Sequence, residues 1–264
     1  MKILFWNTHE NKGINRYIVN LVQDYCIDLL ILAEYAADRD VLSALLSAGG
    51  QRLTYGNTLG CDRIHIWSNY VNMKAGVQDT YYSVQIIQDE LILCCVHLVT
   101  DLHGDRSDER LAIIQRIMHD IEMIENEIKS QKTIIIGDIN EMPYSRGCLN
   151  ANGFHGLPTL DVGDKSTRKV NGVAYRKFYN PMWSLMGDFS YPPGTYYKNQ
   201  AKLHSPMWYM HDQVILSKDI LRLFNKDSLQ IITSCSGADF MDKNRHPNKK
   251  ISDHFPIMCE IRDE

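Results

Sequence analysis

The first half of the chain alternates short apolar runs with amphipathic stretches. Residues 3–6 and 27–33 are apolar apart from Asp28, and each run predicts a buried strand. Residues 14–25 and 38–47 repeat apolar side chains at helical spacing, so each predicts a helix with one buried face. Gly49 and Gly50 end the second helix. The chain therefore begins as strand, helix, strand, helix.

Short strands and one long helix follow. Residues 63–67 and part of 81–87 alternate polar and apolar positions, and residues 91–96 form a continuous apolar run. A helix with a buried stripe from Leu111 to Ile128 comes next, and Asp105 or Ser107 can cap it. Residues 133–136 predict another strand. Because residues 55–97 lack the crossover helices of a parallel sheet, a layered α/β sandwich fits better than a doubly wound sheet.

The second half has weaker periodicity. Residues 141–210 are rich in Gly, Pro and aromatic side chains, and the Asn171-Gly172 pair predicts a hairpin turn. Residues 213–216, 229–233 and 255–261 predict strands. No internal repeat, low-complexity segment or linker divides the sequence, so we expect one domain over residues 1–264.

Composition and charge exclude several classes of protein. The chain has 264 residues, 44% of them hydrophobic, and a net charge of −4, which excludes a strongly basic nucleic-acid coat but permits local basic loops. It contains no run of 18 apolar residues, so we expect no transmembrane helix, and its N-terminus turns polar too early for a signal peptide. Seven scattered cysteines without a Cys-x-x-Cys pair predict reduced thiols in a cytoplasmic protein.

Polar side chains gather at the predicted strand ends. The residues are Asn7, Glu34, His97, Asp138, Asn140, Asp212, Asp253 and His254. One such residue alone is usually a cap or a turn former. The whole set suits a hard divalent cation, which binds oxygen ligands and keeps several waters, next to a phosphate. These positions therefore predict a metal-dependent phosphoesterase, whereas no P-loop, Gly-x-Ser-x-Gly or His-Glu-x-x-His motif occurs.

The ordered motifs resemble those of the endonuclease/exonuclease/phosphatase superfamily, which includes deoxyribonuclease I and apurinic endonucleases. The most specific are Gly137-Asp138-Ile139-Asn140 and Ser252-Asp253-His254-Phe255-Pro256. The others are Ile3-Leu4-Phe5-Trp6-Asn7, Leu30-Ile31-Leu32-Ala33-Glu34, Val96-His97-Leu98 and Asp212-Gln213-Val214-Ile215-Leu216. The resemblance spans nearly the whole chain and implies a four-layered α/β/β/α sandwich of two mainly antiparallel sheets flanked by helices, with the site at one edge of the sheets.

The resemblance also implies a Mg²⁺ or Mn²⁺ site. Glu34 would be the principal metal ligand, with Asn7 and Asp253 close to the metal. Asp138 would orient or deprotonate the attacking water, and Asn140 would hold the phosphate or that water.

Two histidines complete the implied site. His254 would contact the scissile phosphate and be oriented by Asp212, while His97 would lie on the other side of the phosphate, as in the deoxyribonuclease I-like branch. Asp62 is one candidate for the carboxylate partner of His97. Gln213 departs from the usual Asp-x-Ile pattern, and we expect its side chain to face solvent or substrate. The histidines without ligand-like spacing are expected on the surface or in the core: His9, His65, His103, His119, His155 and His204.

Substrate signals are weaker. Ten aromatic residues between positions 175 and 209 could stack nucleobases or build a satellite core. Two basic clusters, one around Arg168 and Arg176 and one around Lys243 and Arg245, could contact a phosphate backbone. The first hypothesis is a nuclease or phosphodiesterase acting on DNA or RNA. The alternatives are an enzyme for small soluble phosphates such as nucleotides or inositol phosphates, and a non-catalytic binding module. We expect no membrane substrate.

Overall fold

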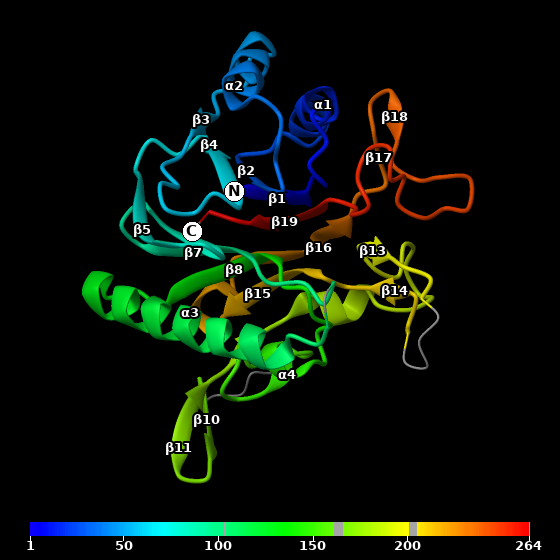
Figure 1. Cartoon of the computed structure of the whole chain (residues 1–264). Helices are drawn as coiled ribbons and strands as arrows, with labels where there is room; N and C mark the ends of the chain where they lie inside the picture. Colours follow the sequence, from blue (N-terminus) through cyan, green and yellow to red (C-terminus); the bar gives the residue numbers. More distant parts are fainter. Residues whose placement is uncertain (103, 161–165, 201–204, 264) are drawn as a thin grey trace.

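Two large sheets form the centre of the computed structural model, which describes residues 1–102, 104–160, 166–200 and 205–263 (Figure 1). The first sheet has the strand order β16 (Phe224–Ile231), β19 (Ile257–Ile261), β1 (Lys2–Asn7), β2 (Leu29–Ala33), β4 (Ile64–Ser68) and β3 (Thr54–Tyr55). The second has the order β5 (Met73–Asp79), β6 (Tyr82–Ile87), β7 (Leu91–His97), β8 (Lys132–Asp138), β15 (Asp212–Ser217), β12 (Phe178–Tyr179) and β9 (Gly156–Leu157).

Helices cover the two outer faces. Helices α1 (Asn15–Tyr25) and α2 (Arg39–Ala48) lie on the first sheet, and α3 (Ser107–Ile128) lies across the second (Figure 1). Side-chain alternation along the strands explains the layers: Phe5 packs between the sheets, whereas its neighbours Leu4 and Trp6 pack beneath α1 and α2. In β8, Ile136 faces the first sheet and Ile135 faces α3. The predicted α/β/β/α arrangement is confirmed.

The directions of the strands bring several strand ends to the same edge of the sandwich. Most neighbouring strands are antiparallel, as expected, but β1 with β2, β7 with β8 and β9 with β12 are parallel. Helix α3 supplies the crossover from β7 to β8. The carboxyl ends of β1, β2, β7 and β8 therefore carry the residues that the sequence singled out.

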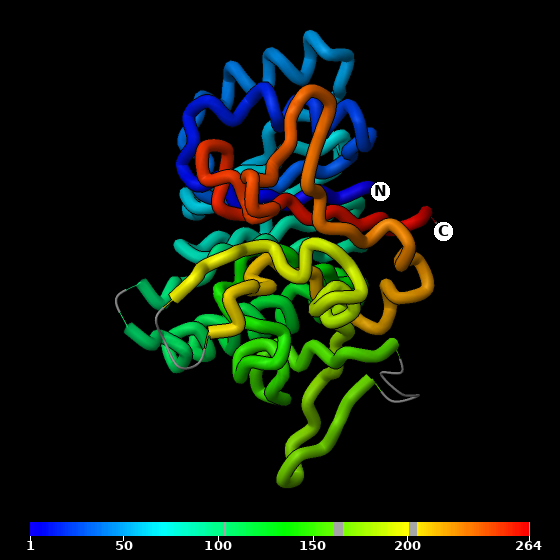
Figure 2. The backbone as a smooth tube through the Cα atoms, turned by 90° about the vertical axis from the view of Figure 1, so that its right-hand side faces the viewer, coloured from blue at the N-terminus to red at the C-terminus, as the bar shows by residue number. Residues whose placement is uncertain are grey.

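Several short helices and strands lie outside the main layers of the sandwich. They are α4 (Arg146–Leu149), η1 (Pro181–Leu185), η2 (Lys218–Ile220), β10 (Thr167–Val170), β11 (Val173–Arg176), β13 (Tyr196–Tyr197), β14 (Trp208–Tyr209), β17 (Ser234–Cys235) and β18 (Ala238–Asp239). The predicted turn at Asn171 and Gly172 is confirmed, because both residues have positive φ, as a type I′ hairpin requires. The β10–β11 hairpin projects from the body in both views (Figure 2).

Several expectations differ from the structure. Strand β5 was not predicted, because its burial is only partial and its sequence lacks a clean alternation. The strand predicted at 229–233 is β16, which begins five residues earlier, at Phe224. Arg106 occupies the cap position of α3, although Asp105 accepts the N–H of Ser107. His103 and His204 lie outside the described residues. Within the described ranges, every helix is too short or too polar to cross a bilayer.

Candidate active site

The strand register joins the predicted residues at one sheet edge. In the second sheet, Asp138 pairs with His97 on β7 and with Asp212 on β15. In the first sheet, Asn7 ends β1 opposite Ala33, which is followed by Glu34. The two sheets therefore present their polar strand ends to the same space.

Asn7 connects the sheets directly. Its Nδ2 donates to Oδ2 of Asp138 at 3.0 Å and to Oε1 of Glu34 at 3.2 Å. Nε2 of His97 lies 3.3 Å from the same Glu34 oxygen and 3.9 Å from Oδ2 of Asp138. Burial raises the pKa of Glu34, but hydrogen bonds from His97 and Asn7 and the charge of His254 outweigh it and lower that pKa to about 2. Glu34 is therefore ionised at neutral pH.

A buried Asp–His pair stands beside them. Nδ1 of His254 lies 2.7 Å from Oδ2 of Asp212, and Nε2 of His254 lies 4.0 Å from Oδ2 of Asp138. Burial disfavours the charged imidazole, yet the carboxylates of Asp212, Asp138 and Asp253 raise the pKa of His254 to about 10. At neutral pH His254 is a cation whose Nε2–H remains available to an anion.

Asp253 pairs with a histidine that follows β1. Its Oδ1 lies 3.2 Å from Nδ1 of His9, whose backbone N–H donates to Oδ1 of Asn7. The hydroxyl of Ser252 donates to the carbonyl of Asn7 and accepts the N–H of His254, which locks the last motif against β1. His9 was expected only on the surface or in the core, because only the fold brings the residue two positions after β1 next to Asp253.

Two site residues have strained backbones. Glu34 has φ +48° and Asn140 has φ +56°, in the left-handed region that Asn tolerates far better than Glu. The N–H of Asn140 donates to Oδ1 of Asp138, and its Nδ2 donates to the carbonyl of Leu98. Such conformations cluster at functional sites, where surrounding contacts hold a side chain in position.

Two sequence expectations are wrong. Gln213 is fully buried and donates to the carbonyl of Glu141 while accepting from Asn180, so it supports the loop after Asn140 and faces neither solvent nor substrate. Asp62 does not pair with His97, because Nδ1 of His97 is buried without a hydrogen-bond partner among the described residues.

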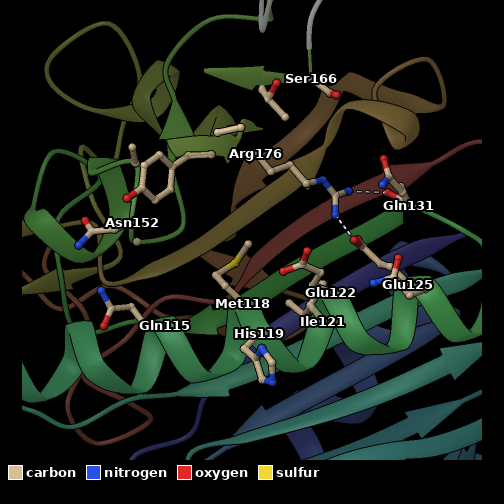
Figure 3. A pocket seen from close by; sticks show the side chains of 16 residues that line it. Gln115, Met118, His119, Ile121, Glu122, Glu125, Gln131, Asn152, Ser166 and Arg176 are labelled. Atoms are coloured by element: carbon tan, nitrogen blue, oxygen red, sulfur yellow. Dashed lines mark hydrogen bonds and ion pairs between the residues drawn. The ribbon is translucent and has the colours of Figure 1, made fainter. Parts of the chain in front are cut away.

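The first basic cluster lies away from the site. Arg168 and Arg176 belong to the β10–β11 hairpin, and the next strand, β12, pairs with Ser217, whereas Asp212 begins the same strand β15 at its other end. Arg176 pairs with Glu125 beside a cavity of about 630 Å³ between α3 and this hairpin (Figure 3). None of the predicted site residues lines that cavity.

The aromatic stretch divides into two groups. Phe178 and Tyr179 are buried in the core. Strands β13 and β14 instead lie next to the site, where Tyr196 approaches His254 with ring centroids 4.8 Å apart. The second basic cluster borders this hairpin, since His246 stacks on Tyr197 of β13 with ring centroids 3.5 Å apart. The core interpretation therefore holds for Phe178 and Tyr179, whereas base stacking by the aromatic residues of β13 and β14 stays a prediction.

The charge of the site fits a cation. Four carboxylates converge with one cationic histidine, and such an excess of negative charge requires compensation. Glu34 and Asp253 are the accessible carboxylates, with 31% and 16% of the side chain exposed. Asp138, Asp212 and His254 also place potential ligand atoms within 4.8 Å of one another, but they are buried and Asp212 is engaged by His254. A hydrated cation can reach the accessible carboxylates without losing all of its water ligands.

Comparison with solved structures supports this description of the fold. The chain matches the 3′ phosphatase NExo from Neisseria bound to a product DNA hairpin, with TM-score 0.62, 16% identity and full coverage of both chains. It matches an AP endonuclease from Archaeoglobus fulgidus with TM-score 0.60, 11% identity and 99% coverage of both chains. The catalytic domain of human Nocturnin follows with TM-score 0.57, 14% identity and coverage of 98% of this chain and 92% of that domain.

No protein-family model and no curated protein sequence matches the chain. The structural matches extend over essentially the whole chain. The chain thus has the deoxyribonuclease I-like fold of the endonuclease/exonuclease/phosphatase superfamily.

Proposed function

We propose that the protein is a divalent-cation-dependent phosphodiesterase that hydrolyses DNA or RNA, with residues 1–264 acting as one catalytic unit. One observation carries the proposal. The carboxylates of Glu34 and Asp138 lie 3.3 and 3.9 Å from Nε2 of His97, and Nε2 of the Asp212-paired His254 lies 4.0 Å from Asp138. A cation site beside an anion-binding imidazolium is what phosphoester hydrolysis requires.

The residues divide the chemistry as follows. Glu34 and Asp253 would hold Mg²⁺ or Mn²⁺, and Asn7 fixes the orientation of Glu34. When bound, the cation neutralises phosphate oxygens. His254 donates from Nε2 to the phosphate because Asp212 occupies Nδ1. Asp138 accepts the proton of the attacking water, and hydrogen bonds from Asn7 and the N–H of Asn140 hold its carboxylate in position.

The remaining two residues bind the substrate. His97 is buried on the far side of Glu34 and Asp138 and contacts the phosphate opposite His254. Asn140 keeps its amide oxygen available, because its Nδ2 is committed to the carbonyl of Leu98. That oxygen orients the attacking water.

A nucleic acid is the favoured substrate. Two proteins of the same fold are described as a DNA-bound 3′ phosphatase and an AP endonuclease. In this chain, Arg245 and His246 stand on the loop that contacts Tyr191 and Tyr197 at the rim of the site. A cationic and aromatic rim suits a backbone with attached bases.

Matched substitutions test the assignment. Glu34→Gln removes an accessible ligand, so we expect at least a tenfold loss of Mn²⁺ affinity by calorimetry. Asp138→Asn removes the base but leaves the accessible ligands, so turnover of single- or double-stranded DNA or RNA should fall about 10²- to 10⁴-fold with Mn²⁺ still bound. Asp227→Asn removes an exposed carboxylate on the edge strand β16 and serves as the control.

The same assay separates the alternatives. Full activity of Asp138→Asn would contradict the role of Asp138. Hydrolysis of nucleotides or inositol phosphates without cleavage of any polynucleotide would identify a small-phosphate enzyme, an alternative that the net charge of −4 favours. Mn²⁺ binding without hydrolysis of any phosphoester would identify a binding module.

A further inference from the structure

The β13–β14 hairpin is anchored to both members of the Asp212–His254 pair. Tyr196 forms an isolated antiparallel bridge with His254, and the N–H of Phe255 donates to the carbonyl of Thr195 at 2.8 Å. The hydroxyl of Thr195 accepts the N–H of Asp212 at 3.2 Å. These contacts fix the hairpin relative to the site and thereby fix the position of the Tyr196 side chain.

The Tyr196 ring lies between two histidines. Its centroid is 4.8 Å from that of His254 and 5.4 Å from that of His211, with interplanar angles of 39° and 35°. The His211 ring is held in turn by Tyr209, at 5.0 Å. The described residues provide no hydrogen-bond partner for the Tyr196 hydroxyl, and Tyr196 is only half-buried.

The electrostatic surroundings keep that hydroxyl protonated at neutral pH. Burial raises the pKa of Tyr196 to about 12, and negative charge from Asp253, Asp138 and Glu34 contributes to the shift. Because the phenol is neutral, it can donate a hydrogen bond without adding negative charge to a site that already holds four carboxylates.

The other tyrosines of the hairpin have structural roles. The Tyr209 hydroxyl accepts from Nε2 of Gln200 at 3.2 Å and lies 3.2 Å from the hydroxyl of Ser205. Tyr197 stacks on His246 with centroids 3.5 Å apart and an angle of 9°. Tyr196 is therefore the hairpin tyrosine whose ring lies against His254 and whose hydroxyl has no hydrogen-bond partner among the described residues.

Building on the proposed function, we propose that the Tyr196 hydroxyl is a catalytic hydrogen-bond donor to a non-bridging oxygen of the reacting phosphate. His254 contacts the same phosphate from Nε2, and the two rings are held against each other by the strand bridge. A donor fixed in this way strengthens its hydrogen bond as negative charge develops on the phosphate oxygens, and needs little reorganisation. The hydroxyl therefore favours the transition state over the bound substrate.

Tyr196→Phe and Tyr209→Phe form a matched pair, because each removes one hydroxyl from the same hairpin. With a Mn²⁺-loaded enzyme and an oligonucleotide that the wild type cleaves, Tyr196→Phe should lower kcat about 10- to 100-fold with little change in KM. Its inhibition by inorganic phosphate should weaken, while Mn²⁺ affinity and the melting temperature stay at wild-type values. Tyr209→Phe should retain wild-type kcat and phosphate inhibition.

Two outcomes would overturn the inference while leaving the proposed function intact. One is wild-type kcat and phosphate inhibition in Tyr196→Phe. The other is an equal loss in both variants, which would assign the effect to packing of the hairpin. If the wild type cleaves no phosphoester, the proposed function fails, and with it the catalytic role of Tyr196. The calorimetric Mn²⁺ measurement shows whether the cation site exists in that case.

Discussion

At the residue scale, His254 combines deep burial with a positive charge. The imidazole can remain protonated because Asp212 accepts from Nδ1 and because Asp138 and Asp253 lie nearby. A pKa of about 10 in the folded state stands well above the value near 6.5 of an exposed histidine. The protonated form therefore stabilises the fold, and pH should reveal its contribution.

We predict that this contribution is complete below about pH 6.5 and is lost as pH rises towards 10. Urea unfolding of the wild type and of His254→Gln in metal-free buffer would measure it. The difference in free energy of unfolding between the two proteins should be about 2–4 kcal/mol larger at pH 6 than at pH 10. Ordinary lysine and tyrosine titrations affect both proteins and cancel. A difference that is independent of pH would contradict the proton assignment.

Most candidate site residues could be identified from the sequence, whereas their contacts with one another could not. Glu34 and Asp138 follow apolar runs and His254 precedes one, so the apolar pattern alone places them near strand ends. His9 and Tyr196 lie in segments without periodicity, and only tertiary structure brings them to Asp253 and His254. Gln213 was misread because both faces of β15 are buried, so alternation no longer separates inside from outside.

At the element scale, strand β8 is the structural centre of the site. It lies between β7 and β15, and its last residue is Asp138. Gly137 precedes Asp138 with φ +151°, and a Cβ at this position would lie 1.9 Å from the carbonyl oxygen of Val96. Only glycine allows β7 to approach so closely, which explains the residue in the Gly-Asp-x-Asn motif.

Gly137→Ala should therefore destabilise the protein by about 2–4 kcal/mol and lower turnover by displacing Asp138. Gly172→Ala is the matched control, because Gly172 also has positive φ but has open space around it. That variant should cost about 1 kcal/mol and leave turnover unchanged. Urea unfolding and turnover of both variants would measure the effects. Equal behaviour of the two would refute a specific role for the close approach of β7 and β8.

At the scale of the whole molecule, the hydrophobic pattern of the sequence was enough to predict the four layers of the sandwich. It was not enough to predict the order of the strands within each sheet. Helices before and after the apolar runs were enough to predict two sheets between helical layers. The place of β19 beside β1, which joins the two ends of the chain, depends on contacts between residues about 250 positions apart. The partly buried strand β5 was missed because edge strands have weak patterns.

The distribution of thiols across this sandwich has a practical consequence. All seven cysteines are free; Cys26 is exposed and Cys235 is half-buried, whereas the other five are buried. Cys61, Cys95 and Cys259 lie between the sheets, and Cys94 and Cys148 lie beneath α3. A thiol reagent should modify the first two quickly under native conditions. Mass spectrometry of the slow phase would then report whether the layers open together, with one rate for all five buried thiols, or whether α3 detaches first and exposes two of them early.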